Sequence, residues 1–188
     1  MNTFEAMKIR KSVRSYQAKA VEPEKIKAVV EAGNMAAGTP MAGKVYFNVI
    51  TNADVLKGIV DCSKAVIGRS GNPMLERISA NPNFDPIYGA PVAVVVSTTK
   101  ASDPSSQSMA TQNAACAGEN MLVAAADLGL ASCYLMSPVM AFFVPEMRSA
   151  AKLPDDAEPV CIIVFGYSDD TAPHADYSET PENIIYVD

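Results

Sequence analysis

The chain has 188 residues, of which 49% are hydrophobic and 19% charged, and its net charge is -6. This size and composition suit a single domain spanning residues 1–188 with a substantial core. The acidic balance excludes a general attraction for nucleic acid or for an anionic membrane, so an anionic ligand must be held by a local basic cluster. No segment reaches the ~20 apolar residues of a membrane helix, and the N-terminus lacks a signal-peptide pattern. We therefore expect a cytoplasmic protein that binds neither nucleic acid nor membrane.

The cysteines and the histidine argue against several kinds of site. Cys62, Cys116, Cys133 and Cys161 stand singly without CxxC spacing, and His174 is the only histidine. This spacing predicts neither a zinc site nor a disulfide framework, and one histidine cannot support a multi-histidine metal site. We predict four core thiols and no bound metal.

The first elements deliver a basic segment. Residues 3–9 predict a short helix, and residues 10–16, RKSVRSY, follow it with three cations and two serine hydroxyls. In an extended chain Arg10, Ser12 and Arg14 lie on one side. Two guanidinium groups with a hydroxyl between them suit a phosphate group. The alternative is a solvated basic turn that closes the first helix.

The middle of the chain alternates helices and strands. Pro23 begins a helix that ends near residue 34, residues 45–50 predict a strand, and Asn52 or Thr51 can cap the next helix. A short helix follows Asn72, and residues 92–97 predict a strand that is buried on both faces. The loops at residues 68–71 and 81–89 are suited to form a lid or a substrate wall. Phe84 and Tyr88 are candidates for such a wall, and local packing is the alternative for both side chains.

A long helix, preceded by a polar loop at residues 98–108, is the central element of the chain. Small apolar residues recur at intervals of three and four from residue 109 to 128, which predicts a buried helix packed by neighbours or by a partner subunit. Gly129 can adopt the left-handed conformation that ends it, and Leu130 can fold back onto the last turn. Residues 131–135 then predict a strand.

The last third predicts further elements. Ser137 and Pro138 open a helix that restarts at Pro145 and continues to residue 153, and residues 160–165 predict a second fully apolar strand. Residues 183–188 have strand propensity.

Several of these stretches together resemble one family. Arg10-x-Ser12-x-Arg14-x-Tyr16 behind a short helix, Ala90-Pro91 before a Val-rich strand, and residues 124–134, AAADLGLASCY, occur in the order found in FMN-dependent nitroreductases. A strand that ends in Gly-Tyr at residues 166–167 also resembles the family. The resemblance covers nearly the whole chain.

The resemblance implies a fold and a cofactor site. The fold is α+β, with a mixed four- or five-stranded sheet surrounded by helices, in an intertwined homodimer that has a long central helix and two FMN sites at its interface. Arg10, Lys11, Ser12 and Arg14 become the candidates to hold the ribityl phosphate of FMN. The segment of Leu135, Met136 and Ser137 is expected to flank the isoalloxazine ring, with the backbone amide of Met136 or Ser137 directed at N5. The C-terminal strand is expected to join the partner's sheet.

Two stretches depart from the family pattern. In the loop at residues 35–44, Met41 stands where the family has an Asn that contacts the flavin, and Gly43 stands at a Gln. Residues 171–188 contain no Lys or Arg, although members carry a basic residue there that completes the phosphate site. Loss of one charged contact costs roughly 1.5 to 3 kcal/mol, so we expect weaker FMN binding.

The function implied by the resemblance is that of an FMN-dependent NAD(P)H oxidoreductase of the nitroreductase kind. NAD(P)H reduces FMN and leaves, and an electron-poor small molecule, a nitroaromatic or a quinone, then takes the electrons in the same pocket. No side chain is expected to be catalytic, because the cofactor carries the chemistry. Two alternatives remain open: an FMN-binding or redox-storage protein with little turnover, and a dimeric scaffold without a cofactor.

Overall fold

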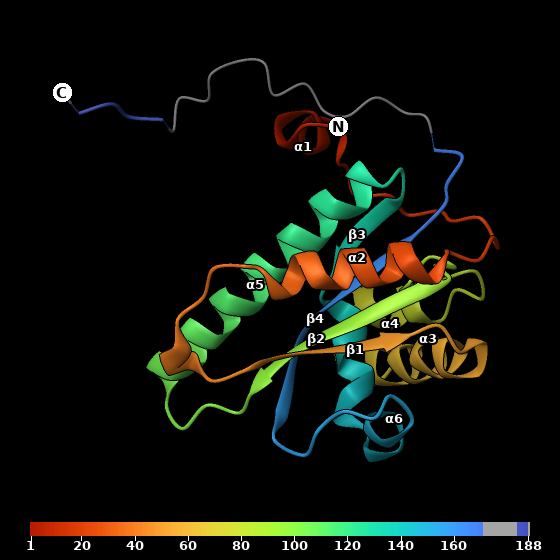
Figure 1. Ribbon diagram of the computed structural model, residues 1–188. Coiled ribbons are helices and arrows are strands. Elements are labelled where there is room, and N and C mark those ends of the chain that lie inside the picture. The colour runs from red at the N-terminus through yellow and green to blue at the C-terminus, as the bar shows by residue number, and fades with distance from the viewer. Residues whose placement is uncertain (171–183, 188) are drawn as a thin grey trace.

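Helices cover both faces of a β-sheet in this chain (Figure 1). The computed structural model describes residues 1–170 and 184–187. Its helices are α1 (Thr3–Ile9), α2 (Pro23–Asn34), α3 (Ala53–Ile67), α4 (Pro73–Ser79), α5 (Pro104–Asp127) and α6 (Pro145–Ala150), with the 3-10 helices η1 (Pro40–Ala42) and η2 (Ser137–Phe143). The strands are β1 (Val45–Ile50), β2 (Val92–Thr99), β3 (Ala131–Leu135) and β4 (Ala157–Gly166).

The sheet confirms the α+β fold class. Among the described residues it has four strands in the order β1-β2-β4-β3, and each neighbouring pair is antiparallel. A parallel bridge between Ser12 and Ser132 attaches the chain after α1 to β3. The bridge therefore fixes the basic segment against the edge of the sheet.

Each face of the sheet has its own hydrophobic core. Val92, Val94 and Val96 of β2 belong to the core under α2 and α5, whereas Ala93 and Val95 belong to the core on the opposite face. This second core contains residues of α3 and η2. All five of these β2 residues are almost completely buried, which confirms the prediction of a strand that is covered on both faces.

The central helix begins five residues earlier than the sequence suggests. The predicted polar loop at residues 98–108 is wrong at both ends, because β2 continues to Thr99 and α5 starts at Pro104. The Asp103 carboxylate caps the helix by accepting hydrogen bonds from the backbone of Ser105 and Ser106, at 2.9 and 3.0 Å. An aspartate followed by proline is a strong start signal that outweighs the serine-rich composition of the first turn.

The end of α5 confirms the prediction from the sequence. Gly129 has a φ of 71°, and the backbone N–H of Leu130 donates to the carbonyl of Ala125 at 2.8 Å. This left-handed close turns the chain directly into β3.

Only one side of α5 is buried within the described part of the chain. The buried side includes Ala114, Met121 and Ala125 over the sheet, whereas Ala115 and Cys116 on the other side are exposed. The expectation that all four cysteines are core thiols is therefore wrong for Cys116. Cys116 follows the buried Ala114 by two residues, a little more than half of a 3.6-residue turn, so it lies on the opposite, exposed side of the helix.

Other boundaries also shift. β4 begins at Ala157, three residues early, because Ala157 pairs with Thr99 at the extended end of β2. The segment predicted as a helix after Ser137 forms a 3-10 helix, and α6 stops at Ala150, before Lys152 takes a φ of 53°.

The predicted C-terminal strand at residues 183–188 lies outside the described residues only at its two ends, 183 and 188. Residues 184–187 are described, are exposed and form no strand within this chain. No helix of the described residues is long and apolar enough to cross a membrane.

Candidate functional site

The basic segment is held between α1 and the edge strand β3. Asn2 and Glu5 form a capping box that starts α1, and the helix ends where the N–H of Arg10 donates to the carbonyl of Ala6 at 3.0 Å. Next, the N–H of Val13 donates to the carbonyl of Ser132 at 2.9 Å, and the Val13 side chain is buried. The chain is thus extended here, as the sequence predicts.

Three of the predicted phosphate ligands influence one buried thiol. Burial raises the pKa of the Cys133 thiol, while the positive charges of Arg14 and Arg10 and a hydrogen bond from Ser12 act in the opposite direction. The shared orientation of Arg10, Ser12 and Arg14 stays a prediction, because Arg10 and Arg14 line different cavities.

The basic residues differ in their partners. Arg10 Nε lies 3.6 Å from Glu119 Oε1, and Lys11 Nζ lies 2.9 Å from Asp170 Oδ1. Arg10 and Lys11 line a small cavity of about 170 Å³ beside the end of α5. Within residues 1–170 and 184–187, Arg14 forms no salt bridge, and its side chain lines a different and larger cleft.

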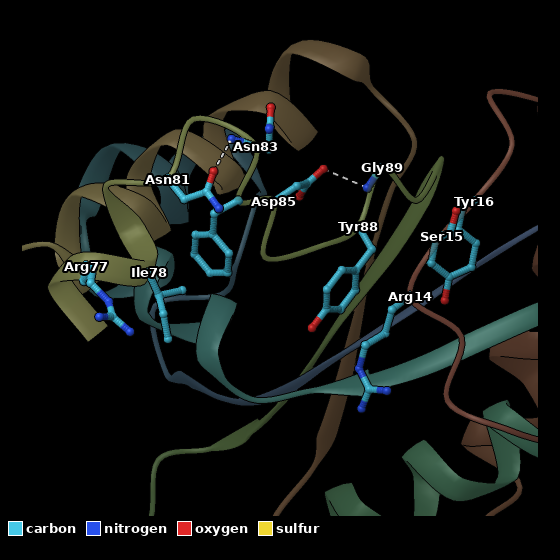
Figure 2. Close-up of a pocket in the computed structure, with 11 residues that line it drawn as sticks. Arg14, Ser15, Tyr16, Arg77, Ile78, Asn81, Asn83, Asp85, Tyr88 and Gly89 are labelled. Carbon is cyan, nitrogen blue, oxygen red and sulfur yellow. Dashed lines mark hydrogen bonds between the residues drawn. The ribbon is translucent and has the colours of Figure 1, made fainter. Parts of the chain in front are cut away.

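The larger cleft has a volume of about 770 Å³, within the range of about 300 to 1,000 Å³ that is usual for ligand sites. Its walls come from the basic segment, from α4 and from the loop that leads to β2 (Figure 2). Figure 2 shows Arg14 and Arg77 on opposite sides of the cleft, with Tyr88 between them. The structure also places Phe84 in the lining, so both candidates for a substrate wall face the same cleft as Arg14.

The cleft wall that bears Tyr88 is a hydrogen-bonded turn. The Asp85 carboxylate accepts hydrogen bonds from the backbone N–H groups of Ile87 at 2.8 Å and Gly89 at 2.7 Å. Tyr88 has a φ of 59°, an unusual conformation for a residue with a bulky side chain. Asp85 therefore fixes a strained turn that presents the Tyr88 ring at the cleft.

Tyr16 closes the cleft beside Arg14. Its hydroxyl donates to the carbonyl of Val13 at 2.9 Å, and burial raises its pKa well above the ordinary value for tyrosine. Tyr16 therefore stays neutral and acts as a fixed wall of the cleft.

Arg77 is a cleft residue that the sequence analysis did not identify. It lies in the last turn of α4, where a basic residue is common because it complements the helix dipole. A single arginine in a seven-residue helix has no distinctive pattern. Only its position across from Arg14 marks it as a candidate.

The segment after β3 continues toward the same region. The parallel bridge between Ser12 and Ser132 means that the chain from Ser12 to Arg14 runs in the same direction as β3. Leu135 is buried, whereas Met136 is 67% exposed at the start of η2, and Ser137 is also exposed. The backbone of residues 136–137 is thus accessible from outside the core.

The loop with Met41 and Gly43 lies elsewhere in the chain. It is attached to the N-terminal half of α5 through Thr39, whose N–H donates to Asn113 Oδ1 at 3.0 Å. By contrast, the N-terminus pairs with Asp127 at the last turn of α5. One chain therefore does not bring Met41 and Gly43 together with the basic segment, and their contact with FMN stays a prediction.

Gly43 has a structural requirement of its own. Its φ is 76°, and a Cβ atom at this position would lie 2.9 Å from the Cβ of Thr99. Met41, in contrast, is 80% exposed. Gly43 is thus required for the close approach of the loop to β2, whether or not it contacts a ligand.

Comparisons with known proteins agree with the fold. Residues 7–167 match the model of the family described as "Nitroreductase family". The chain is similar to a nitroreductase with bound FMN from Bacteroides fragilis, with 25% identity, 100% of both chains covered and a TM-score of 0.88. A nitroreductase with bound FMN from Desulfitobacterium hafniense has the same fold, with 21% identity, 100% of both chains covered and a TM-score of 0.83.

A sequence relative extends this similarity to another organism. It is a Methanothermobacter thermautotrophicus protein named for NADH dehydrogenase and NAD(P)H nitroreductase activity. The two are 25% identical over 170 residues, which is 89% of this chain and 78% of the relative. The family match ends at residue 167, so the single domain over residues 1–188 stays a prediction.

Proposed function

Because the chain belongs to the nitroreductase family, we propose that it is an FMN-dependent oxidoreductase that carries electrons from NAD(P)H to a nitroaromatic or quinone. The observation that carries this proposal is the cleft of about 770 Å³ that is lined by Arg14 of the basic segment. The FMN-bound relative from Bacteroides fragilis, which aligns over the full chain, supports the choice of cofactor.

The residues present fit FMN. Ser12 and Arg14 are exposed, so a hydroxyl and a cation are available for a phosphate group, and Arg10 adds a second cation that is next to Glu119. Lys11 pairs with the carboxylate of Asp170, so its positive charge would attract the phosphate from a longer distance. These four side chains would hold the phosphate, and residues 135–137 would flank the ring system. When bound, FMN supplies a two-electron relay between NAD(P)H and the acceptor.

The chain's own residues position the reactants. Tyr16 and Tyr88 give the cleft rigid aromatic walls, one fixed by its hydroxyl and the other by its turn. Exposed residues such as Arg14, Ser15 and Gly89 line the cleft, so water can enter it and supply the proton that the acceptor consumes. For a nitro acceptor, one NAD(P)H and one proton convert the nitro group into a nitroso group and water, with release of NAD(P)+.

We also propose that the working unit is a homodimer. Ala115 and Cys116 lie at the middle of the exposed side of α5, and their side chains are small, so a second copy can pack closely against them. A second copy would also bring its loop with Met41 and Gly43 toward the basic segment, which one chain alone does not do. This arrangement agrees with the interface sites that the family resemblance implies.

The first test is the visible absorption spectrum of the purified protein after addition of FMN and dialysis. We expect flavin bands that survive dialysis, and we expect Arg14→Ala to weaken FMN binding by tenfold to a hundredfold, because a charged contact to an anion is lost. Arg69→Ala is the matched control, since Arg69 is exposed and outside the cleft lining. A protein that retains no flavin would overturn the proposal in favour of a dimeric scaffold.

The second test separates an enzyme from a storage protein. The holoprotein is mixed with NADPH or NADH and with a nitroaromatic or quinone. Oxidation of the nucleotide is followed at 340 nm, the wavelength at which the reduced nicotinamide absorbs. We expect many turnovers per FMN. Oxidation that stops after one equivalent would instead support a redox-storage protein with little turnover.

A further inference from the structure

Two arginines face each other across the large cleft without carboxylate partners. Neither Arg14 nor Arg77 forms a salt bridge within the part of the chain that the structure describes. Figure 2 shows them on opposite sides of the cleft. If Arg14 serves FMN, as proposed above, Arg77 remains as a second cation with no assigned role.

The acidic residue next to Arg77 in the sequence and the one in the cleft lining both accept backbone hydrogen bonds. Glu76 precedes Arg77 in α4, and its Oε1 accepts a hydrogen bond from the N–H of Gly71 at 3.0 Å. Asp85 lines the cleft, but its two oxygens accept from the backbone N–H groups of Ile87 and Gly89. The guanidinium group of Arg77 is therefore free to bind an anion.

The same cleft offers apolar and aromatic contacts next to this cation. Ile78 is 40% exposed at the lining, and Phe84 and Tyr88 belong to it as well. An aromatic ring can pack on such side chains while an anionic substituent reaches the guanidinium group. A protein with a net charge of -6 repels anions in general, so a local arginine is needed to select one.

We propose that Arg77 determines acceptor specificity by binding an anionic substituent, a carboxylate or sulfonate, on an electron-poor aromatic acceptor. The proposal rests on the proposed function and adds the substrate class to it. Arg77 binds the substituent, the ring lies against Ile78, Phe84 and Tyr88, and the reducible group remains free to approach FMN. Arg77 is thus a specificity residue and takes no part in electron transfer.

The test compares two nitroaromatic acceptors, one with an anionic and one with a neutral group opposite the nitro group. Steady-state rates of the holoprotein are measured with 4-nitrobenzoate and with its neutral methyl ester. We expect the ratio of kcat/KM for the carboxylate to kcat/KM for the ester to exceed the ratio of their intrinsic reactivities by tenfold or more. This excess should become smaller at high ionic strength. Intrinsic reactivity is calibrated with free reduced FMN and both compounds.

Variants of Arg77 then localise the effect. Arg77→Gln should lower kcat/KM for 4-nitrobenzoate by tenfold or more and for the ester by less than twofold. Arg77→Lys should recover part of the preference, because it restores the charge without the forked geometry. Arg69→Gln, remote from the cleft lining, should leave both values unchanged.

Calorimetric titration of the holoprotein with 4-nitrobenzoate gives a readout that does not depend on turnover. We expect the affinity for the carboxylate to fall about tenfold in Arg77→Gln. Equal losses for both acceptors, release of FMN, or a raised KM for NAD(P)H alone would each overturn the proposal, because Arg77 would then serve the fold, the flavin or the reductant. Absence of turnover with both acceptors would overturn the proposed function, and the titration would still decide whether Arg77 binds the carboxylate.

Discussion

The two sides of α5 differ in what they contact. The inner side is packed against the sheet, where Met121 and Ala125 are completely buried, whereas Ala115 and Cys116 on the outer side are exposed. Both sides have small apolar residues, and the sequence periodicity alone does not separate them. The difference shows that a helix with small apolar residues on both sides can be open on one of them within a single chain.

The largest expected loss of stability comes from the inner side. Met121→Ala should lower the free energy of unfolding by roughly 2 to 5 kcal/mol, because a fully buried side chain between α2, α5 and the sheet is replaced by a cavity. Chemical denaturation monitored by circular dichroism measures the change. Gln112→Ala on the exposed side is the control, and a similar loss in this variant would contradict the comparison.

A charge on the outer side should act on assembly. Ala115→Glu places a carboxylate at the middle of the exposed side, and we expect it to raise the dissociation constant of the proposed dimer by about a hundredfold, or roughly 3 kcal/mol. Analytical ultracentrifugation measures this constant. The variant's unfolding free energy as a monomer should change by less than about 0.5 kcal/mol. An unchanged dimer would mean that α5 is not at the interface.

Alkaline pH should weaken the core under the inner side. Burial raises the pKa of Cys161 in this core to about 11, above its ordinary value of 9.0. Between these values the unfolded chain loses the proton and the folded chain keeps it, so stability is intact below pH 9 and falls as the pH rises toward 11.

At 1.4 kcal/mol for each unit of pKa difference the full loss is roughly 3 kcal/mol, and we expect about 2 kcal/mol of it to be present at pH 11. Denaturation curves at pH 8 and pH 11 measure it. Cys161→Ala should show a smaller difference between the two pH values. If the variant and the parent protein decline equally, another group is responsible.

The smallest expected effect is at Gly118, on the inner side. Its added Cβ would lie 2.9 Å from Cε2 of Tyr134 and 3.2 Å from Cδ1 of Ile163. Overpacking costs roughly 1 to 3 kcal/mol, and the better helix propensity of alanine returns about 1 kcal/mol. Gly118→Ala should therefore destabilise the fold by about 1 kcal/mol in thermal denaturation. A stabilised variant would mean that Tyr134 moves aside without cost.

Much of the fold could be predicted because its boundaries are local signals. Pro23, Asn52 and Asn72 mark helix starts that the structure confirms, and Gly129 ends α5 as expected. Asp103 is a comparable signal, but the serine-rich segment that follows it is typical of a loop. The extra residues of β4 depend on pairing with β2, which no local pattern reveals.

The candidate site was predictable only in part. The basic segment has a recognisable spacing, so Arg10, Ser12 and Arg14 could be proposed from the sequence, and their contact with a ligand stays a prediction. Arg77 could not, because its role depends on a cleft formed between distant segments. Met41 was assigned by position in a family pattern, and the structure leaves it away from the basic segment of its own chain.

The sequence by itself determined the order of helices and strands, the buried β2 strand and the extended basic segment, because caps, periodicity and side-chain alternation act over a few residues. The tertiary structure decided which side of α5 is exposed and which arginines form no salt bridge among the described residues. It also decided that Arg14 and Arg77 line one cleft. These properties depend on contacts between residues far apart in the chain. Only the packing of the helices on the sheet brings such residues together.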